Sequence, residues 1–358
     1  MKSKNYPIIV LLLSSLSLIA SADDPDSVTR ASTHAPVGVM GDHVHEKGEM
    51  MVSYRFMNMD MEGSRVGGDA ISVNAIATTV PNRFFGRPGQ PPTLRVVPTD
   101  MTMEMHMFGL MYAPSERVTL MAMLNYVEKE MTHTTFAGGM GTNIRGQFVT
   151  KSSGMGDTPI SALITLAGND KYNIHATLGV SLPTGSTTKD DDIFTPMGGR
   201  PTVRLPYPMQ LGSGTFDPII GLTYTSDSGV FSYGVQWRSV LRVQDNDQEY
   251  RYGDEHNLTS WLSYEWSQVF SASLRLNYLD RGKIEGIDTS IVAPVQTAGP
   301  ENSGLEQLDF GVGFNYAASG KWNGHRLSAE YLLPLSRTTS GPQLETDAML
   351  ILGYQHAF

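Results

Sequence analysis

Histidine side chains gather in the sequence ahead of the first regular segment. His43 and His45 are separated by one residue, so in an extended chain both imidazoles lie on one face. His34 and Met40 lie upstream, and Asp42 adjoins His43. Imidazole nitrogen, thioether sulfur and carboxylate oxygen suit copper or zinc. These residues form a candidate metal site, with copper the one cofactor suggested; alternatively, the histidines are solvated or hydrogen-bonded in a tail or plug.

Methionine is concentrated in the same part of the chain. Sixteen of the 20 methionines lie between Met40 and Met155. Thioethers are soft donors for Cu(I) or Ag(I), which predicts a soft-metal pathway. Methionine also packs as a flexible apolar side chain, and this second interpretation stays open. Many of the methionines fall at alternate positions: Met57, Met59, Met61, Met101, Met103, Met105, Met107, Met121 and Met123.

The composition excludes several kinds of chemistry. With no cysteine, thiolate zinc sites, iron–sulfur clusters and cysteine nucleophiles are excluded. A net charge of -10 lacks the basic surface that nucleic acid requires. His106, His175 and His256 have acids nearby, but no spacing selects a catalytic pair, so we do not expect an enzyme. The run 190–192 is either a calcium site or a solvated loop tip.

The N-terminus has the features of an export signal. Lys2 and Lys4 precede an apolar stretch, and Ala20-Ser21-Ala22 forms a small-residue cleavage site. We therefore expect residues 1–22 to be a signal peptide that is removed after export. Residues 23–48 would then form a periplasmic N-terminal segment or a lumen plug.

Alternation of apolar and mixed side chains marks most of the remaining chain. Strands of about ten residues with aromatic side chains at the edges of the apolar face are typical of membrane barrels. For example, Phe231, Tyr233, Val235 and Trp237 alternate with small or polar residues. The expected strands are 49–60, 101–112, 118–131, 156–167, 172–182, 215–225, 230–243, 255–266, 269–280, 306–317, 323–334 and 346–358.

The connections between these strands alternate in length. Those after even-numbered strands, such as 113–117 and 267–268, are short, whereas those after odd-numbered strands, such as 61–100 and 132–155, are longer. Outer-membrane barrels have this alternation of periplasmic turns and extracellular loops. Residues 49–358 are thus predicted to form an all-β, transmembrane, antiparallel up-and-down barrel of about twelve strands in the bacterial outer membrane, in contact with its lipid.

The face assignment predicts which side chains line the lumen. On β-strand 101–112, Glu104 and His106 are expected to point inward, which turns Met101, Met103, Met105 and Met107 toward lipid. The predicted lumen residues are Arg55, Met57, Met59, Glu104, His106, Met121, Met123, His175, Arg238, Arg275 and Glu330.

The last six residues, 353–358, place Gly353 five positions before the terminal Phe358, and the outward positions Tyr354, His356 and Phe358 follow at a spacing of two. This pattern resembles the C-terminal signal of bacterial outer-membrane barrels, which implies the barrel assembly machinery as a partner.

Internal segments resemble a known family. The segments 154–157, 181–185, 211–218 and 221–224 are similar to outer-membrane transporters grouped with the phenol meta-pathway degradation family. The resemblance implies a channel for small, often hydrophobic compounds. We expect an outer-membrane channel or transporter for a small solute, with soft metal ions such as copper as the sharper hypothesis. The alternatives are an outer-membrane enzyme of the lipid hydrolase or protease type, and a structural or adhesive surface protein.

Overall fold

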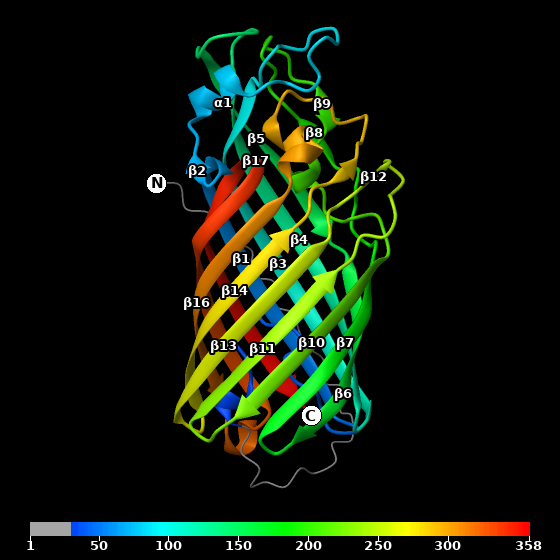
Figure 1. The fold of residues 1–358 in the computed structure, drawn as a ribbon, viewed down its shortest axis with the longest axis vertical. Helices are drawn as coiled ribbons and strands as arrows, with labels where there is room; N and C mark the ends of the chain where they lie inside the picture. Colours follow the sequence, from blue (N-terminus) through cyan, green and yellow to red (C-terminus); the bar gives the residue numbers. More distant parts are fainter. Residues whose placement is uncertain (1–29) are drawn as a thin grey trace.

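The computed structural model describes residues 30–358, so the predicted signal peptide lies outside the described residues. Antiparallel strands form a closed barrel, each pairing with the next along the path, and β17 pairs with β1 (Figure 1). The predicted fold class is confirmed. The barrel strands are β1 (Met50–Gly67), β3 (Val96–Ser115), β4 (Val118–Phe136), β6 (Thr158–Asn169), β7 (Tyr172–Leu182), β10 (Asp217–Asp227), β11 (Phe231–Val240), β13 (Glu255–Ser267), β14 (Phe270–Arg281), β16 (Leu305–Ala317) and β17 (His325–Ala357).

The long strand β17 passes along the barrel twice. Its residue Arg326 pairs with Ala317, and its residue Ala357 pairs with Met51, both at the end with the short turns. At the opposite end Thr339 is the register partner of both β16 and β1. The chain therefore rises and returns within β17. The closed path has 11 labelled strands, and because β17 crosses the barrel wall twice, the chain crosses it twelve times. This agrees with the prediction of about twelve.

Some strands extend beyond the predicted bounds at the long-loop end. The prediction of a loop over 132–155 was wrong, because β4 continues to Phe136 and pairs with β5 (Ile144–Met155). This extension has polar side chains on its outer face, such as Lys151, which is well exposed beside Glu130. Without an apolar outer face the sequence pattern resembles that of a loop, although the backbone continues as sheet.

The remaining elements belong mostly to the long loops, which gather at one end, while the C-terminus lies at the other (Figure 1). Ser72 caps the N-terminus of a short helix, where its side chain accepts a hydrogen bond from the Ala75 N–H. No helix in residues 30–358 has the length and apolarity to cross a membrane. These elements are β2 (Asp69–Ala70), α1 (Val73–Thr79), β8 (Asp190–Asp192), β9 (Thr202–Arg204), β12 (Tyr250–Arg251), β15 (Glu285–Gly286), and the 3-10 turns η1 (Ala31–Thr33), η2 (Tyr207–Met209), η3 (Gln296–Ala298), η4 (Pro300–Asn302) and η5 (Gly320–Trp322).

An apolar band covers the outer surface of the barrel. Trp237 and Tyr278 are exposed toward the long-loop side, and Tyr264 and Tyr316 toward the short-turn side. Exposed leucines, such as Leu262 between these levels, complete the band. An apolar belt with aromatic residues at both edges fits the hydrocarbon layer and its two interfaces.

The predicted faces of β3 are reversed in the structure. Met107 is the register partner of Arg55, which is buried inside, whereas His106 pairs with Phe56 and Tyr126 on the outer face. Glu104 also lies outside, so both residues were wrongly assigned to the lumen. The reason is that β3 rises beyond the apolar band, where polar side chains on the outer face meet water. The methionines at positions 101, 103, 105 and 107 consequently face inward.

Candidate functional site: the N-terminal segment and the methionine wall

Residues 30–49, here called the N-terminal segment, are held at both ends near the short turns. At one end Arg30 forms ion pairs with Asp227 at 3.1 Å and Glu265 at 2.9 Å. At the other, the Gly48 N–H donates to the Ala113 carbonyl oxygen at 2.8 Å, and the segment continues into β1. Between these anchors, its residues contact the inward side chains of several strands.

A buried ion pair fixes the middle of the segment. Arg275 Nε donates to Glu330 Oε1 at 2.7 Å, and both side chains are almost fully buried. The Gly38 N–H donates to Glu330 Oε2 at 2.8 Å. A Cβ at Gly38 would lie 2.5 Å from Arg275 Nη2 and 2.6 Å from Glu330 Oε2, so only glycine fits. Of these two predicted lumen residues, Glu330 thus binds the backbone of the N-terminal segment, and Arg275 holds Glu330 in place.

Further contacts secure the segment on the other side of the lumen. Gly41 adopts a φ of +64°, and its carbonyl oxygen accepts from His175 Nε2 at 2.9 Å and from Gln236 at 3.3 Å. The His45 N–H donates to Thr119 Oγ1 at 2.9 Å. Arg238, two residues after Gln236, shares its face of β11. Because these hydrogen-bond partners come from β4, β7 and β11, the segment crosses the interior from one wall to another.

The structure brings the predicted histidine ligands together. One donor atom each from His34, Asp42 and His43 lie within 4.8 Å of one another. The ring centroids of His34 and His43 are 4.4 Å apart, and those of His43 and His45 are 4.8 Å apart. His45 is not part of this donor group, and the Met40 carbonyl oxygen accepts a hydrogen bond from Gln236 at 3.0 Å.

Carboxylates orient two of the imidazoles. Asp42 Oδ1 lies 2.9 Å from His43 Nδ1, and Glu49 Oε2 lies 3.0 Å from His45 Nδ1. The opposite nitrogens, His43 Nε2 and His45 Nε2, are buried and have no hydrogen-bond partner within the described chain, and the same is true of His34 Nδ1. A carboxylate that fixes one ring nitrogen is the arrangement that prepares the other nitrogen for a metal.

Burial and neighbouring charges set the ionisation of the group. Burial lowers the pKa of His34 well below its usual value, and the nearby Arg326 guanidinium lowers it further. For Asp42, burial alone would raise the pKa, but the charge and hydrogen bond of His43 hold it well below its usual value. At neutral pH the group therefore contains a neutral His34 and an ionised Asp42.

A small cavity adjoins His43. It has about 10 Å³ of space, enough for one small ion or water molecule. Its walls combine an imidazole, a carboxylate, a guanidinium and four thioethers. The lining residues are Gly41, Asp42, His43, Met51, Ser53, Arg55, Gly109, Met111, Met121 and Met123.

Methionines continue from this cavity along the inward faces of β1, β3 and β4, and we call this surface the methionine wall. The pairing register aligns them in rows across neighbouring strands, although Arg55 and Ser53 interrupt it on β1. The predicted inward residues Met57, Met59, Met121 and Met123 belong to it, and those of β3 were missed because Glu104 and His106 misled the face assignment. The rows are Met51, Met111 and Met121; Met57 and Met105; Met349, Met59 and Met103; and Met61, Met101 and Met131.

The third long loop, residues 183–216 between β7 and β10, covers the upper end of the methionine wall. Lys129 Nζ donates to the carbonyl oxygens of Pro208 at 2.7 Å and Gln210 at 2.6 Å. Met209 is fully buried against Met101 and Met131. The loop residues thus reach into the barrel, and the wall runs between them and the N-terminal segment.

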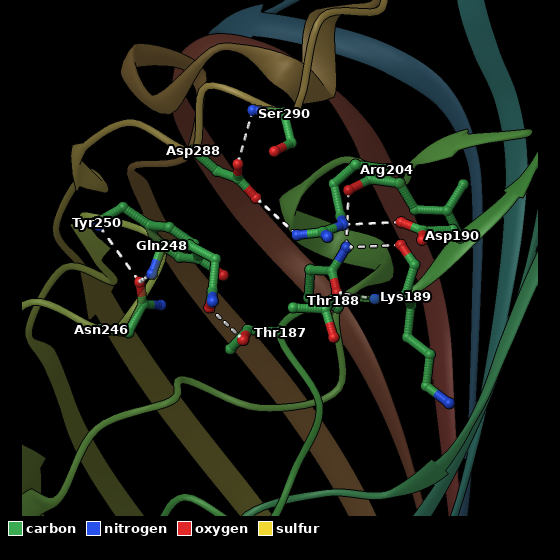
Figure 2. Close-up of polar contacts among 12 residues, drawn as sticks. Thr187, Thr188, Lys189, Asp190, Arg204, Asn246, Gln248, Tyr250, Asp288 and Ser290 are labelled. Atoms are coloured by element: carbon green, nitrogen blue, oxygen red, sulfur yellow. Dashed lines mark hydrogen bonds and ion pairs between the residues drawn. The ribbon is translucent and has the colours of Figure 1, made fainter.

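Polar contacts join the long loops above the barrel (Figure 2). Arg204 binds Asp190 at 2.8 Å and Asp288 at 3.1 Å, which ties the third long loop to the loop 282–304 between β14 and β16. Thr187 donates to Gln248, which lies in the loop 241–254 between β11 and β13. These loops also share a buried apolar cluster, here called the loop core. It comprises Phe84, Val96, Phe148, Ile193, Tyr207, Tyr250, Ile284, Ile291, Ala293, Val295 and Ala298.

The acidic run that could have held calcium is bound to protein groups instead. Asp190 pairs with Arg204, Asp191 accepts from the Lys151 N–H at 2.8 Å, and Asp192 accepts from Thr202 at 2.5 Å. Each carboxylate therefore already has a partner on a neighbouring strand.

The C-terminal residues complete the barrel seam. The Phe358 N–H donates to the Met50 carbonyl oxygen at 2.8 Å, and the Met50 N–H donates back at 2.9 Å. Tyr354 and Phe358 are exposed on the outer face. Gly353 faces the N-terminal segment, where an added Cβ would lie 2.5 Å from Val37. Gly353 thus has a packing role that the terminal motif did not indicate.

One serine–histidine pair bears on the enzyme alternative. Ser239 Oγ and His256 Nδ1 lie 2.7 Å apart. Ser239 is fully buried, so its oxygen offers no access to a substrate. Asp280 is the register partner of His256, but within residues 30–358 no ion pair joins them. The pair has the distance of a catalytic dyad without the accessibility of one.

Comparisons with known proteins identify a family and a solved outer-membrane barrel of similar fold. The family described as "Putative MetA-pathway of phenol degradation" matches residues 85–333. No curated protein matches the sequence. An outer-membrane channel from Pseudomonas putida F1 has a similar fold, with a TM-score of 0.58 and 14% identity over 89% of this chain and 98% of that chain.

Two further solved barrels are more distant. The beta domain of the Bordetella autotransporter BrkA has a TM-score of 0.46 and 10% identity, over 87% of this chain and 100% of that one. The Pseudomonas putida toluene transporter TodX has a TM-score of 0.43 and 7% identity, over 87% and 90%.

Proposed function

The chain belongs to this phenol-degradation family, as its internal motifs predicted, and on that premise we propose that it is an outer-membrane channel for a small solute. The observation that carries the proposal is a closed barrel, apolar outside, whose interior is crossed by a chain segment rather than filled by a continuous apolar core. The similar fold of an outer-membrane channel supports it.

The methionine wall favours a soft metal ion as the solute. Rows along a strand lie about 6.8 Å apart when they are two residues apart, because each residue rises about 3.4 Å. Thioethers in successive rows offer Cu(I) or Ag(I) a series of weak sites from the N-terminal segment to the third loop. Several weak sites in series allow an ion both to enter and to leave.

The first experiment tests permeation. Purified protein in liposomes that contain a fluorophore quenched by Ag(I) should admit Ag(I) faster than protein-free liposomes, and a variant that lacks residues 30–45 should admit it faster still. If neither protein passes Ag(I), potassium or a small sugar, the channel proposal is wrong.

The second experiment tests the solute class. Replacing Met57, Met59, Met103 and Met105 with leucine keeps the volume but removes the thioethers, and should slow Ag(I) entry at least about tenfold. The matched control replaces Met140 and Met197, loop methionines that are 78% and 79% exposed, and should leave the rate unchanged. Equal Ag(I) rates for all three proteins would remove the soft-metal pathway while leaving the channel.

A further inference from the structure

We infer that the N-terminal segment carries a resident Cu(I)-class site, in which His34 Nδ1 and His43 Nε2 bind one soft monovalent ion together with a methionine thioether from the adjoining cavity. This is an equilibrium binding site, so it does not depend on permeation through the barrel. The flux experiments therefore do not decide whether this site exists, and the titration described below tests it separately.

The first argument is the unmet bonding capacity of the imidazoles. Three buried ring nitrogens lack a hydrogen-bond partner within residues 30–358, and they come from His34, His43 and His45, three neighbouring rings. Buried polar atoms in folded proteins are normally hydrogen-bonded. A metal ion bound by His34 and His43 would satisfy two of these three nitrogens.

The second argument is the support behind the ligands. Asp42 Oδ1 holds His43 Nδ1, while Asp42 Oδ2 accepts from the Ala35 N–H at 2.9 Å. One carboxylate therefore ties together the two parts of the segment that carry His34 and His43. Arg326 Nη2 donates to the Ala35 carbonyl oxygen at 3.2 Å, which fixes the same turn to the barrel wall. The donor atoms are thus positioned by the fold without the ion.

The third argument identifies the class of metal. The cavity beside His43 is lined by four methionines, and thioether sulfur selects soft ions. Arg55 lines the same cavity, and Arg326 binds the carbonyl oxygen of Ala35, next to His34, so two guanidinium groups lie near the site. A monovalent ion carries half the positive charge of Zn²⁺, so the two guanidinium groups repel it less strongly. Charge and donor softness both favour Cu(I) or Ag(I).

The test is a titration of the whole barrel in detergent with Cu(I), in competition with a chromophoric chelator, and separately with Ag(I). Wild-type protein should bind one ion tightly, and His34→Gln with His43→Gln should weaken binding by more than about 100-fold, beyond the effect expected for supporting residues. His106→Gln, on the outer face, is the matched control and should bind like wild type. Equal affinity of the double variant and wild type overturns the proposal, as does tighter binding of Zn²⁺ than of Cu(I).

X-ray absorption at the copper edge supplies an independent readout. A shell that mixes imidazole nitrogen with at least one sulfur supports the site, whereas a shell of sulfur alone or nitrogen alone overturns it. Heat-modifiable migration in gels shows whether each variant is folded. If the histidine variant does not fold, a variant with all four cavity methionines, Met51, Met111, Met121 and Met123, changed to leucine replaces it. Weaker Cu(I) binding and loss of sulfur from the shell support the proposal, and unchanged values overturn it.

Discussion

At the scale of single residues, Arg275 and Glu330 form a buried ion pair in the lumen in which each charge depends on the other. Both charges are removed from water, and Glu330 also holds the Gly38 N–H. Removing one partner leaves the other charge buried and uncompensated, which typically costs about 3–5 kcal/mol.

We therefore expect Glu330→Gln to lower the thermal midpoint of the barrel, measured by heat-modifiable gel migration. Replacing both residues with methionine should recover most of the loss, because no unpaired charge remains. A single variant as stable as wild type would contradict this account of the pair.

Asp42 gives a second prediction at this scale. Asp42→Asn keeps the size of the side chain but removes the charge that orients His43, and should weaken Cu(I) binding about 10–100-fold. Chelator competition measures the change. Asp60→Asn, on the exposed upper part of β1, is the control and should bind as wild type does.

The sequence could indicate His34, His43 and His45, since their spacing and residue types are local. It indicated Asp42 beside His43, but it could not indicate that Glu49 orients His45, because that contact depends on how the segment turns inside the barrel. Glu104 and His106 were misplaced for a related reason. A polar side chain predicts contact with water, but above the apolar band water lies on both faces.

At the scale of elements, the corrected orientation of β3 can be tested with cysteines, since the chain has none of its own. Glu104→Cys should react with a membrane-impermeant maleimide in the folded barrel in lipid. Phe108→Cys, at a position 49% exposed within the apolar band, should react only with a lipid-soluble reagent. Met105→Cys should become reactive after residues 30–45 are deleted. If Met105→Cys behaves like Phe108→Cys, the two faces are assigned wrongly.

Strands in the apolar band were predictable because lipid outside and polar lumen inside impose a period of two. The upper parts of β4 and β5 were not, because they lack the apolar face that makes this period visible. The loop core joins residues from six separate connections or strands, and no local pattern specifies such long-range packing.

At the scale of the whole molecule, two features lie in series along the interior: the N-terminal segment near the short turns and the loop core above. Deleting residues 30–45 alone should give modest ion conductance in planar bilayers. Adding Arg204→Ala and Asp288→Ala, which removes a largely buried ion pair between two loops, should raise it severalfold further. If the deletion alone gives the full conductance, the loops are no barrier.

Salt should also matter, because Arg30 is only partly buried in its ion pairs with Asp227 and Glu265. Such pairs contribute about 0–1 kcal/mol each and weaken as ionic strength rises. We expect Arg30→Gln to increase the open fraction of single channels roughly 2–10-fold, with little further response to salt. A wild-type open fraction that is independent of salt would show that the ion pairs of Arg30 do not hold the segment in place.

The two ends of the N-terminal segment are attached with very different strength. Beyond Gly48 the segment runs directly into the seam, where Met50 and Phe358 exchange two backbone hydrogen bonds, whereas at Arg30 the attachment consists largely of side-chain charges, with one backbone bond at Ala31. The segment is therefore attached firmly next to β1 and β17, the strands that close the barrel, and more weakly at Arg30 on the opposite side. Displacement of the segment would therefore start at Arg30, and the contacts of Gly38, Gly41 and His45 with the barrel wall would have to break next before the histidines could leave the lumen.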